Sequence, residues 1–130
     1  MTSDNLYMNF QETESFQKTK TIINNLEENI KKQNSNIYSE LDNSQKSILK
    51  DVCWKKMNRK GERTMRETTY VDYSYKRPKV KIIIFVKYSS DSQKLQKVTI
   101  QINLGYSMDY TIYDSRPENT ENIEFTITPQ

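Results

Sequence analysis

The sequence predicts an α+β fold, in which one or more N-terminal helices that are prone to form a coiled coil precede an antiparallel meander of four or five strands packed on the helix. Hydrophobic residues recur at helical spacing as far as Gly61, and at every second position beyond it. The alternating segments follow one another with short connections. Helices followed by closely connected strands favour an antiparallel sheet over a parallel one.

The first helical segment carries a hydrophobic seam. Leu26 follows Ile23 by three residues, and the residues that recur at intervals of seven are Phe16, Ile23, Ile30 and Ile37. This spacing is typical of a coiled coil, so these five side chains are candidates for contact with a partner helix. Thr19 and Gln33 interrupt the seam, and a helix that packs one stripe on its own domain is an equal alternative. We therefore expect a helical, coiled-coil-prone segment over residues 1–40.

The second segment, residues 41–130, is expected to contain a helix and the whole sheet. A helical stripe begins at Leu41 and continues through Ile48, Leu49, Val52, Cys53 and Met57. Gly61 follows a strongly cationic run, and a glycine after a cationic last turn is a common helix stop. We expect the helix to end there.

The strands are expected at residues 65–75, 80–88, 98–104, 110–112 and 123–127, with a turn over 105–109. Residues 98–104 alternate between apolar and polar side chains, which indicates one dry and one wet face. Ile83 and Phe85 fall on the wet face, where Tyr70 and Tyr113 are expected beside them. Such a patch is often a protein interface, although an N-terminal helix folded over it would explain it equally well.

Chemistry-bearing residues are scarce. The chain has no histidine, one cysteine and two glycines, which argues against serine-type triads, most metal sites and glycine-rich phosphate loops. Cys53 falls on an apolar helical stripe and is expected to be a small buried hydrophobe. We therefore expect no enzyme, cofactor, metal or small-molecule ligand. One thiol, no apolar run long enough to cross a bilayer and no leader-like segment favour an intracellular, non-membrane protein.

Nucleic-acid binding is the alternative function. It would use the basic and aromatic stretch 54–79, where cations contact phosphates and aromatic rings stack on bases. The candidate contacts are Trp54, Lys55, Lys56, Arg59, Lys60, Arg63 and Arg66. Acidic residues such as Glu62 and Glu67 interrupt the stretch, and cations are expected at a helix C-terminus in any case, so we rank this function second.

Residues 80–117 resemble the RWD-like globular domains of kinetochore coiled-coil subunits, and the nearest type is Spc twenty-five. The family pattern is an apolar strand, an alternating strand after a polar turn, then a tyrosine, an apolar residue two positions later and a proline five beyond that. Here these parts are Ile82–Val86, then Val98, Ile100, Ile102 and Leu104, then Tyr110, Ile112 and Pro117. The family closes with a helix after the proline, whereas residues 123–127 have strand spacing.

The resemblance implies a scaffold without catalysis that acts in chromosome segregation in the nucleus. The seam would pair with a sister subunit, and the sheet domain would contact that partner, with Ile83 and Phe85 as candidates on its face. The expected function is therefore a protein-interaction scaffold, most concretely a kinetochore-type subunit that forms a homo- or hetero-oligomer. Partner identity and stoichiometry stay open.

Overall fold

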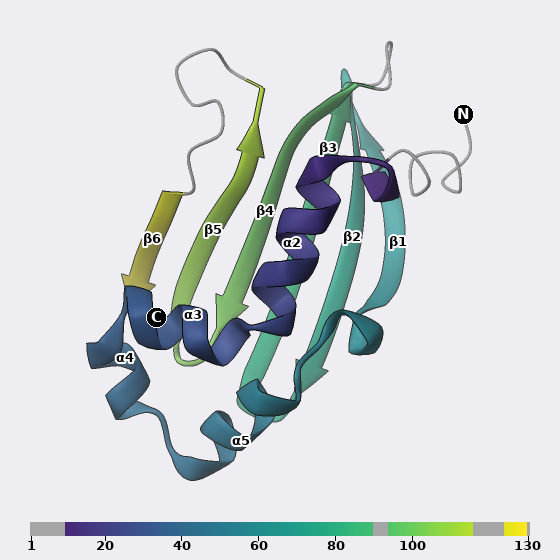
Figure 1. Ribbon diagram of the computed structural model, residues 1–130. Coiled ribbons are helices and arrows are strands. Elements are labelled where there is room, and N and C mark those ends of the chain that lie inside the picture. The colour runs from purple at the N-terminus through teal and green to yellow at the C-terminus, as the bar shows by residue number, and fades with distance from the viewer. Residues whose placement is uncertain (1–9, 90–93, 116–123, 130) are drawn as a thin grey trace.

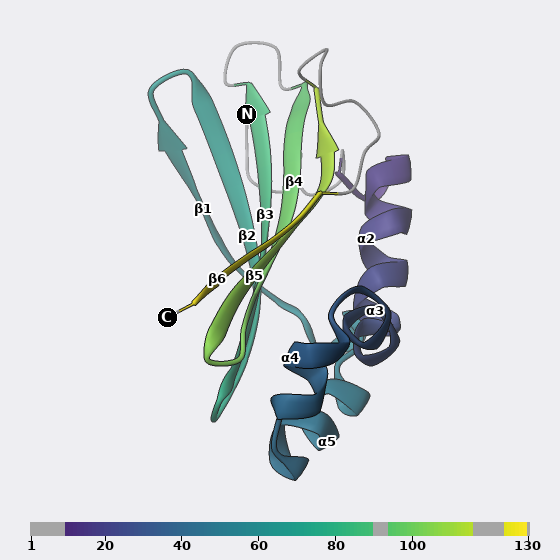
Figure 2. The same cartoon turned by 90° about the vertical axis from the view of Figure 1, so that its left-hand side faces the viewer.

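The computed structural model describes residues 10–89 and 94–115, and the backbone of residues 124–129. Four short helices precede a six-stranded antiparallel sheet in these residues, which confirms the α+β class and the meander. The expected number of four or five strands is too low, because residues 58–65 form an additional strand. The helices lie along one face of the sheet (Figures 1 and 2). No helix among the described residues is long and apolar enough to cross a membrane.

The helical half of the chain is broken at polar caps. The helices are α2 (Glu14–Asn24), α3 (Leu26–Gln33), α4 (Ser35–Glu40) and α5 (Asn43–Asp51). The side chain of Asn34 accepts a hydrogen bond from the Ile37 backbone N–H at the start of α4. Asp42 and Gln45 form a capping box at the start of α5. Such side chains satisfy the N–H groups that a helix start leaves without partners, so each one favours a new helix over a continuous one.

The prediction that the second helix continues to Gly61 is wrong. Helix α5 ends at Asp51, a 3₁₀ turn η1 covers Trp54–Lys56, and the chain is extended from Asn58 to Met65 as strand β1. Val52 already has extended dihedral angles. Of the cations before Gly61, Lys55 and Lys56 therefore belong to η1, and Arg59 and Lys60 belong to a strand at the sheet edge, where charged residues are also common.

The strands follow one another in sheet order. They are β1 (Asn58–Met65), β2 (Thr68–Arg77), β3 (Val80–Ser89), β4 (Leu95–Asn103), β5 (Tyr106–Asp114) and β6 (Glu124–Pro129). Two-residue turns join β1 to β2 and β2 to β3, and Glu67 and Lys79 take positive φ angles there. Gly105, at φ +91°, lets β5 begin at Tyr106, four residues before the expected start at Tyr110.

Side chains from the helices and the strands form one buried cluster. The helices contribute Phe16, Ile23, Leu26, Ile30, Ile37 and Leu49, and the strands contribute alternate residues such as Val71, Ile84, Ile100 and Tyr110. Polar contacts also join the layers, because the Tyr106 hydroxyl lies 2.7 Å from a Glu40 carboxylate oxygen and Lys79 lies 3.2 Å from Asp42. Described hydrophobic residues on both sides of the expected boundary after residue 40 thus share one core.

Candidate interaction site on the open face of the sheet

The described helices cover one face of the sheet, and the opposite face is the open face (Figure 2). Strand pairing places its side chains in rows. One row contains Tyr70, Lys87 and Lys97, the next contains Asp72, Phe85 and Thr99, and a third contains Ser74, Ile83 and Gln101. All nine residues are half-buried. Neighbouring side chains on the sheet therefore shield one another while the face remains accessible.

The centre of the open face is apolar. Ile83 and Phe85 both lie on β3, a central strand, as the alternating pattern predicts. Tyr70 joins them from β2, with the Arg63 guanidinium 5.3 Å from its ring centroid and the Lys87 ammonium 5.9 Å from it. Cations at these distances attract the face of an aromatic ring through cation–π interaction. The patch is therefore an apolar centre with a cationic border on one side.

Tyr113 does not join this patch. The pairing of β4 with β5 shifts by one residue, so that Val98 pairs with Tyr113 and Thr99 pairs with Thr111. The extra residue, Ile112, is a β-bulge, and a bulge reverses which face the following side chains take. Tyr113 consequently packs against the core on the helix-covered side, contrary to the expectation that it would stand beside Phe85.

Acidic groups balance the cations of the open face. Burial raises the pKa of Asp72, while Arg63 and Lys60 oppose that shift. Asp72 Oδ1 is buried and has no hydrogen-bond partner among the described residues. Lys87 and Lys97 are directly opposite each other, and Asp114 Oδ2 lies 4.0 Å from the Lys97 ammonium. Mixed charges around an apolar centre are typical of a surface that binds protein, whereas a nucleic-acid surface is more uniformly basic.

The open face has a shallow hollow of about 260 Å³ beside Phe85. Its lining residues are Tyr70, Phe85, Lys87, Lys97, Thr99, Gln101 and Asp109. Aromatic carbon forms part of the hollow, and lysine ammonium groups and a carboxylate stand around it. A hollow of this volume can receive one large side chain of a partner but is below the usual size of a cofactor pocket.

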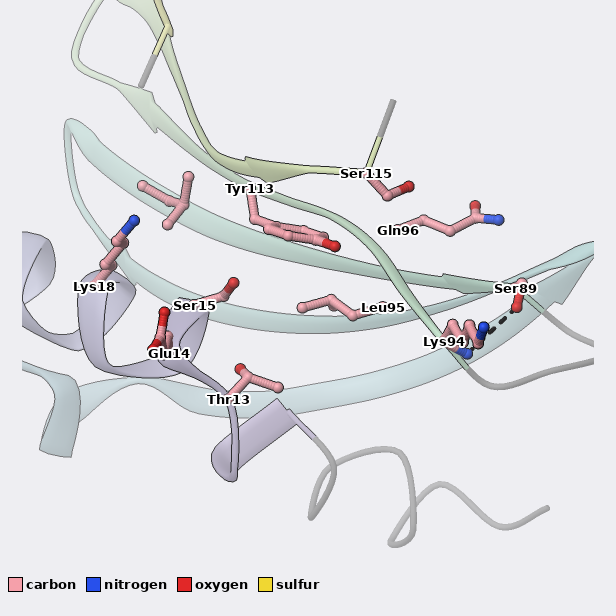
Figure 3. A pocket seen from close by; sticks show the side chains of 11 residues that line it. Thr13, Glu14, Ser15, Lys18, Ser89, Lys94, Leu95, Gln96, Tyr113 and Ser115 are labelled. Carbon is pink, nitrogen blue, oxygen red and sulfur yellow. Dashed lines mark hydrogen bonds between the residues drawn. The ribbon is translucent and has the colours of Figure 1, made fainter. Parts of the chain in front are cut away.

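A larger cavity lies on the helix-covered side, between the first turn of α2 and the ends of β3, β4 and β5 (Figure 3). Its volume is about 660 Å³. Leu95, Ile112 and Tyr113 provide apolar surface, and the polar lining residues are Thr13, Glu14, Ser15, Lys18, Ser89, Lys94, Gln96 and Ser115. This lining can hold an apolar group by burial. No cysteine or histidine is among the lining residues.

The five seam residues are buried within the chain itself. Ile23 and Ile30 are completely buried, and Phe16, Leu26 and Ile37 are at most 8% exposed. The structure thus brings the five together, with all of them in contact with the chain's own core. This is the arrangement of the alternative in which the helix packs one stripe on its own domain. Pairing through the seam would require these side chains to exchange their present contacts.

The basic stretch is split between three elements. Trp54, Lys55 and Lys56 form η1, Arg59, Lys60 and Arg63 lie on β1, and Arg66 is in the following turn. The Trp54 indole is half-buried between two rings, 5.1 Å from Phe16 and 5.4 Å from Tyr73 between centroids. Its contacts are therefore structural. The cations other than Arg59 are exposed, and Lys60 and Arg63 lie on the edge strand.

The described residues include one thiol and no cluster of metal-ligating side chains. No group of three histidine, cysteine, aspartate or glutamate side chains there could hold a metal ion. Cys53, which was expected to be buried, is half-buried.

Comparison of the chain with protein-family models, curated proteins and solved structures gives no match. What the protein does must therefore be inferred from its own surfaces. Sequence reasoning placed Ile83 and Phe85 correctly on one face, since alternation alone determines that. It missed the opposed lysines Lys87 and Lys97 and the cavity of Figure 3, because both depend on which residues become neighbours between strands.

Proposed function

We propose that this protein is a non-catalytic protein-interaction module that docks a partner protein on the open face of its sheet. The observation that carries the proposal is the placement of Ile83 and Phe85 at the centre of that face, with Tyr70 beside them and no described helix over them. An apolar centre with aromatic residues and a charged border matches the anatomy of protein interfaces.

The kinetochore resemblance supports a more specific form of the proposal. The parts of the resemblance that the structure describes lie on or next to β3, β4 and β5, which are consecutive neighbours in the sheet. Pro117 lies outside the described residues. In this form the protein is a kinetochore-type subunit that contacts a sister subunit. Strand β6 follows where the resemblance implies a helix, so a docking surface that involves the C-terminal helix of the family is not included in the proposal.

The open face is a better candidate interface than the helical seam. Docking on Ile83 and Phe85 needs no rearrangement, because both side chains are already accessible. Pairing through Ile23 and Ile30 would expose a completely buried part of the core before a partner could cover it. Each such side chain costs roughly 1.5–3 kcal/mol to expose to water. Coiled-coil pairing therefore stays a secondary form of the proposal.

Site-specific photocrosslinking in cells that make the protein tests the proposal. A benzophenone-bearing phenylalanine at position 85 is expected to form an adduct with a partner protein, and the same group at exposed Lys20 on α2 is the control. Adding Ile83→Lys to the position-85 probe should remove the adduct at unchanged expression. An adduct with nucleic acid instead of protein would favour the alternative function. Equal adducts at positions 85 and 20 would contradict a specific face.

A further inference from the structure

Strand β1 is an open edge of the sheet. Among the described residues it pairs with β2 alone (Figure 1). Every β1 residue except Arg59 is exposed. A bulge separates Arg59 from Gly61, and from Gly61 to Met65 the pairing with β2 is regular. The backbone N–H and C=O groups that point away from β2 over Gly61–Met65 can therefore accept another strand.

The charge of this edge is strongly positive. Between Lys55 and Glu67 the chain has six cationic side chains and two anionic ones. Glu62 compensates Arg59, with 4.0 Å between Arg59 Nη2 and Glu62 Oε2. Lys60 is exposed at the bulge, and Arg63 stands over the Tyr70 ring on the open face. The excess charge favours an acidic partner and disfavours a second copy of the same edge, since like charges on opposed strands repel.

Met65 provides an apolar contact on the same edge. It is the exposed large hydrophobic residue of the described chain, with 53% of its surface accessible. Met65 pairs with Thr68, and Arg63 pairs with Tyr70, so both side chains lie on the open-face side of β1. An unbranched thioether adapts its shape to the apolar side chain that it meets. A strand that docks on this edge should therefore contain acidic side chains for the cations and an apolar side chain for Met65.

We propose that β1 binds an acidic, extended segment of another protein as an additional strand of the sheet. The segment pairs with the backbone of Gly61–Met65, places a carboxylate near Arg63 or Lys60, and packs an apolar side chain on Met65. This edge meets the docking face at Arg63 and Tyr70, but strand pairing uses neither Ile83 nor Phe85, so the inference does not depend on the proposed docking face. The competing explanation is that the cations and the bulge prevent any strand from binding.

Fluorescence anisotropy with synthetic peptides and the whole chain tests the inference. The probe is a labelled ten-residue peptide of alternating glutamate and valine. Two peptides serve as controls: the same sequence with N-methyl groups on alternate residues, which removes hydrogen bonds on one edge, and a lysine-valine peptide. We expect saturable binding of the acidic peptide, with at least tenfold weaker binding of both controls.

Protein variants locate the site. Lys60→Glu/Arg63→Glu should weaken binding of the acidic peptide at least tenfold, and Met65→Ser should weaken it several-fold. Lys20→Glu/Lys32→Glu changes the net charge equally at exposed helical positions and should leave the dissociation constant within twofold of wild type. Ile83→Lys should also leave it unchanged, which separates this edge from the docking face.

Three results would overturn the inference. Equal binding of the N-methylated peptide would show that charge alone attracts the probe. Equal weakening by the Lys20/Lys32 variant would show that β1 is not the site. No binding at low salt, together with self-association of the Lys60/Arg63 variant, would show that the cations protect the edge.

Discussion

The Trp54 indole stands edge-on to the Phe16 ring, with 5.1 Å between the ring centroids and 75° between the ring planes. The same indole lies 5.4 Å from Tyr73, and Phe10 lies 5.4 Å from Phe16 and 6.0 Å from Tyr73. These four aromatic rings join the segment before α2, helix α2, the turn η1 and strand β2. The first helix is therefore tied to the sheet near β1 and β2 through Trp54.

Replacing Trp54 should loosen this junction. We expect Trp54→Ala to lower the free energy of unfolding by about 3 kcal/mol, because it removes a large aromatic contact and leaves a cavity. Trp54→Phe should lower the free energy of unfolding by less than half as much. Urea unfolding followed by circular dichroism measures both. The exposed neighbour Lys55→Ala is the control, and an equal loss in that variant would contradict a specific role for the indole.

The second prediction concerns the seam. Ile30 is completely buried, so a carboxylate at this position would be desolvated without a partner. We expect Ile30→Asp to lower the free energy of unfolding by about 4 kcal/mol or more. Lys32→Asp, at an exposed position of the same helix, should have little effect.

Protein concentration distinguishes the two roles of the seam. If the seam packs inside its own chain, unfolding of Ile30→Asp is independent of concentration. If it pairs with a second copy, raising the concentration restores helicity by mass action. Circular dichroism and light scattering over a wide concentration range measure these outcomes. A folded variant with wild-type stability at all concentrations would contradict both roles.

Asp42 predicts a dependence of stability on acid. Its carboxylate accepts a hydrogen bond from the Gln45 backbone N–H at 2.8 Å and lies 3.2 Å from the Lys79 ammonium. These contacts, the Gln45 bond first, hold the pKa of Asp42 below its ordinary value of 3.8. A carboxyl whose pKa is lower in the folded state stabilises the fold above the unfolded pKa and ceases to do so as the pH falls through the folded pKa.

Asp42→Asn keeps an N-cap oxygen and removes the charge. We therefore expect a lower melting temperature than wild type at pH 7, and a difference that shrinks as the pH falls below about 4. Asp42→Ala should be less stable than Asp42→Asn at neutral pH, because it also removes the cap. Melting temperatures from pH 2 to pH 7 measure this. A difference that stays constant over that range would contradict the electrostatic role.

Tyr110 predicts the opposite dependence at alkaline pH. Burial raises the pKa of Tyr110, and also that of Tyr88, above the ordinary tyrosine value of 10.0. The folded state therefore keeps these phenols neutral, and its stability falls as the pH rises above 10, where the unfolded chain ionises. Tyr110→Phe removes one such group at similar volume. Relative to wild type it should gain up to about 1.4 kcal/mol for each pH unit above 10.

Urea unfolding at pH 7, 10 and 11 measures this gain as a change in the difference between the two proteins. Comparing differences cancels any pH-independent effect of losing the hydroxyl. A difference that is the same at all three pH values would mean that the Tyr110 phenol ionises equally well in the folded and unfolded states.

Local pattern was sufficient for much of the sheet. Val98, Ile100 and Ile102 alternate with Thr99 and Gln101, and the structure buries the first set and leaves the second on the open face. The placement of Ile83 and Phe85 followed from the same rule. The alternation rule gave the wrong face for Tyr113, because a one-residue bulge reverses the faces of the side chains that follow it. The helix end at Gly61 was also wrong, because cations before a glycine suit a helix end as well as a sheet edge.

The sequence by itself determined the α+β class, the order of the central strands and which residues of β3 and β4 lie on each sheet face, because helical and strand periodicities depend on residues close together in the chain. Only the tertiary structure decided that the helical seam is buried in the same core as the strands, that β1 forms an edge, and that Lys87 faces Lys97. Those features depend on contacts between residues far apart in the chain. An apolar stripe on a helix indicates that this side of the helix is buried. Which surface buries it depends on the packing of the whole fold.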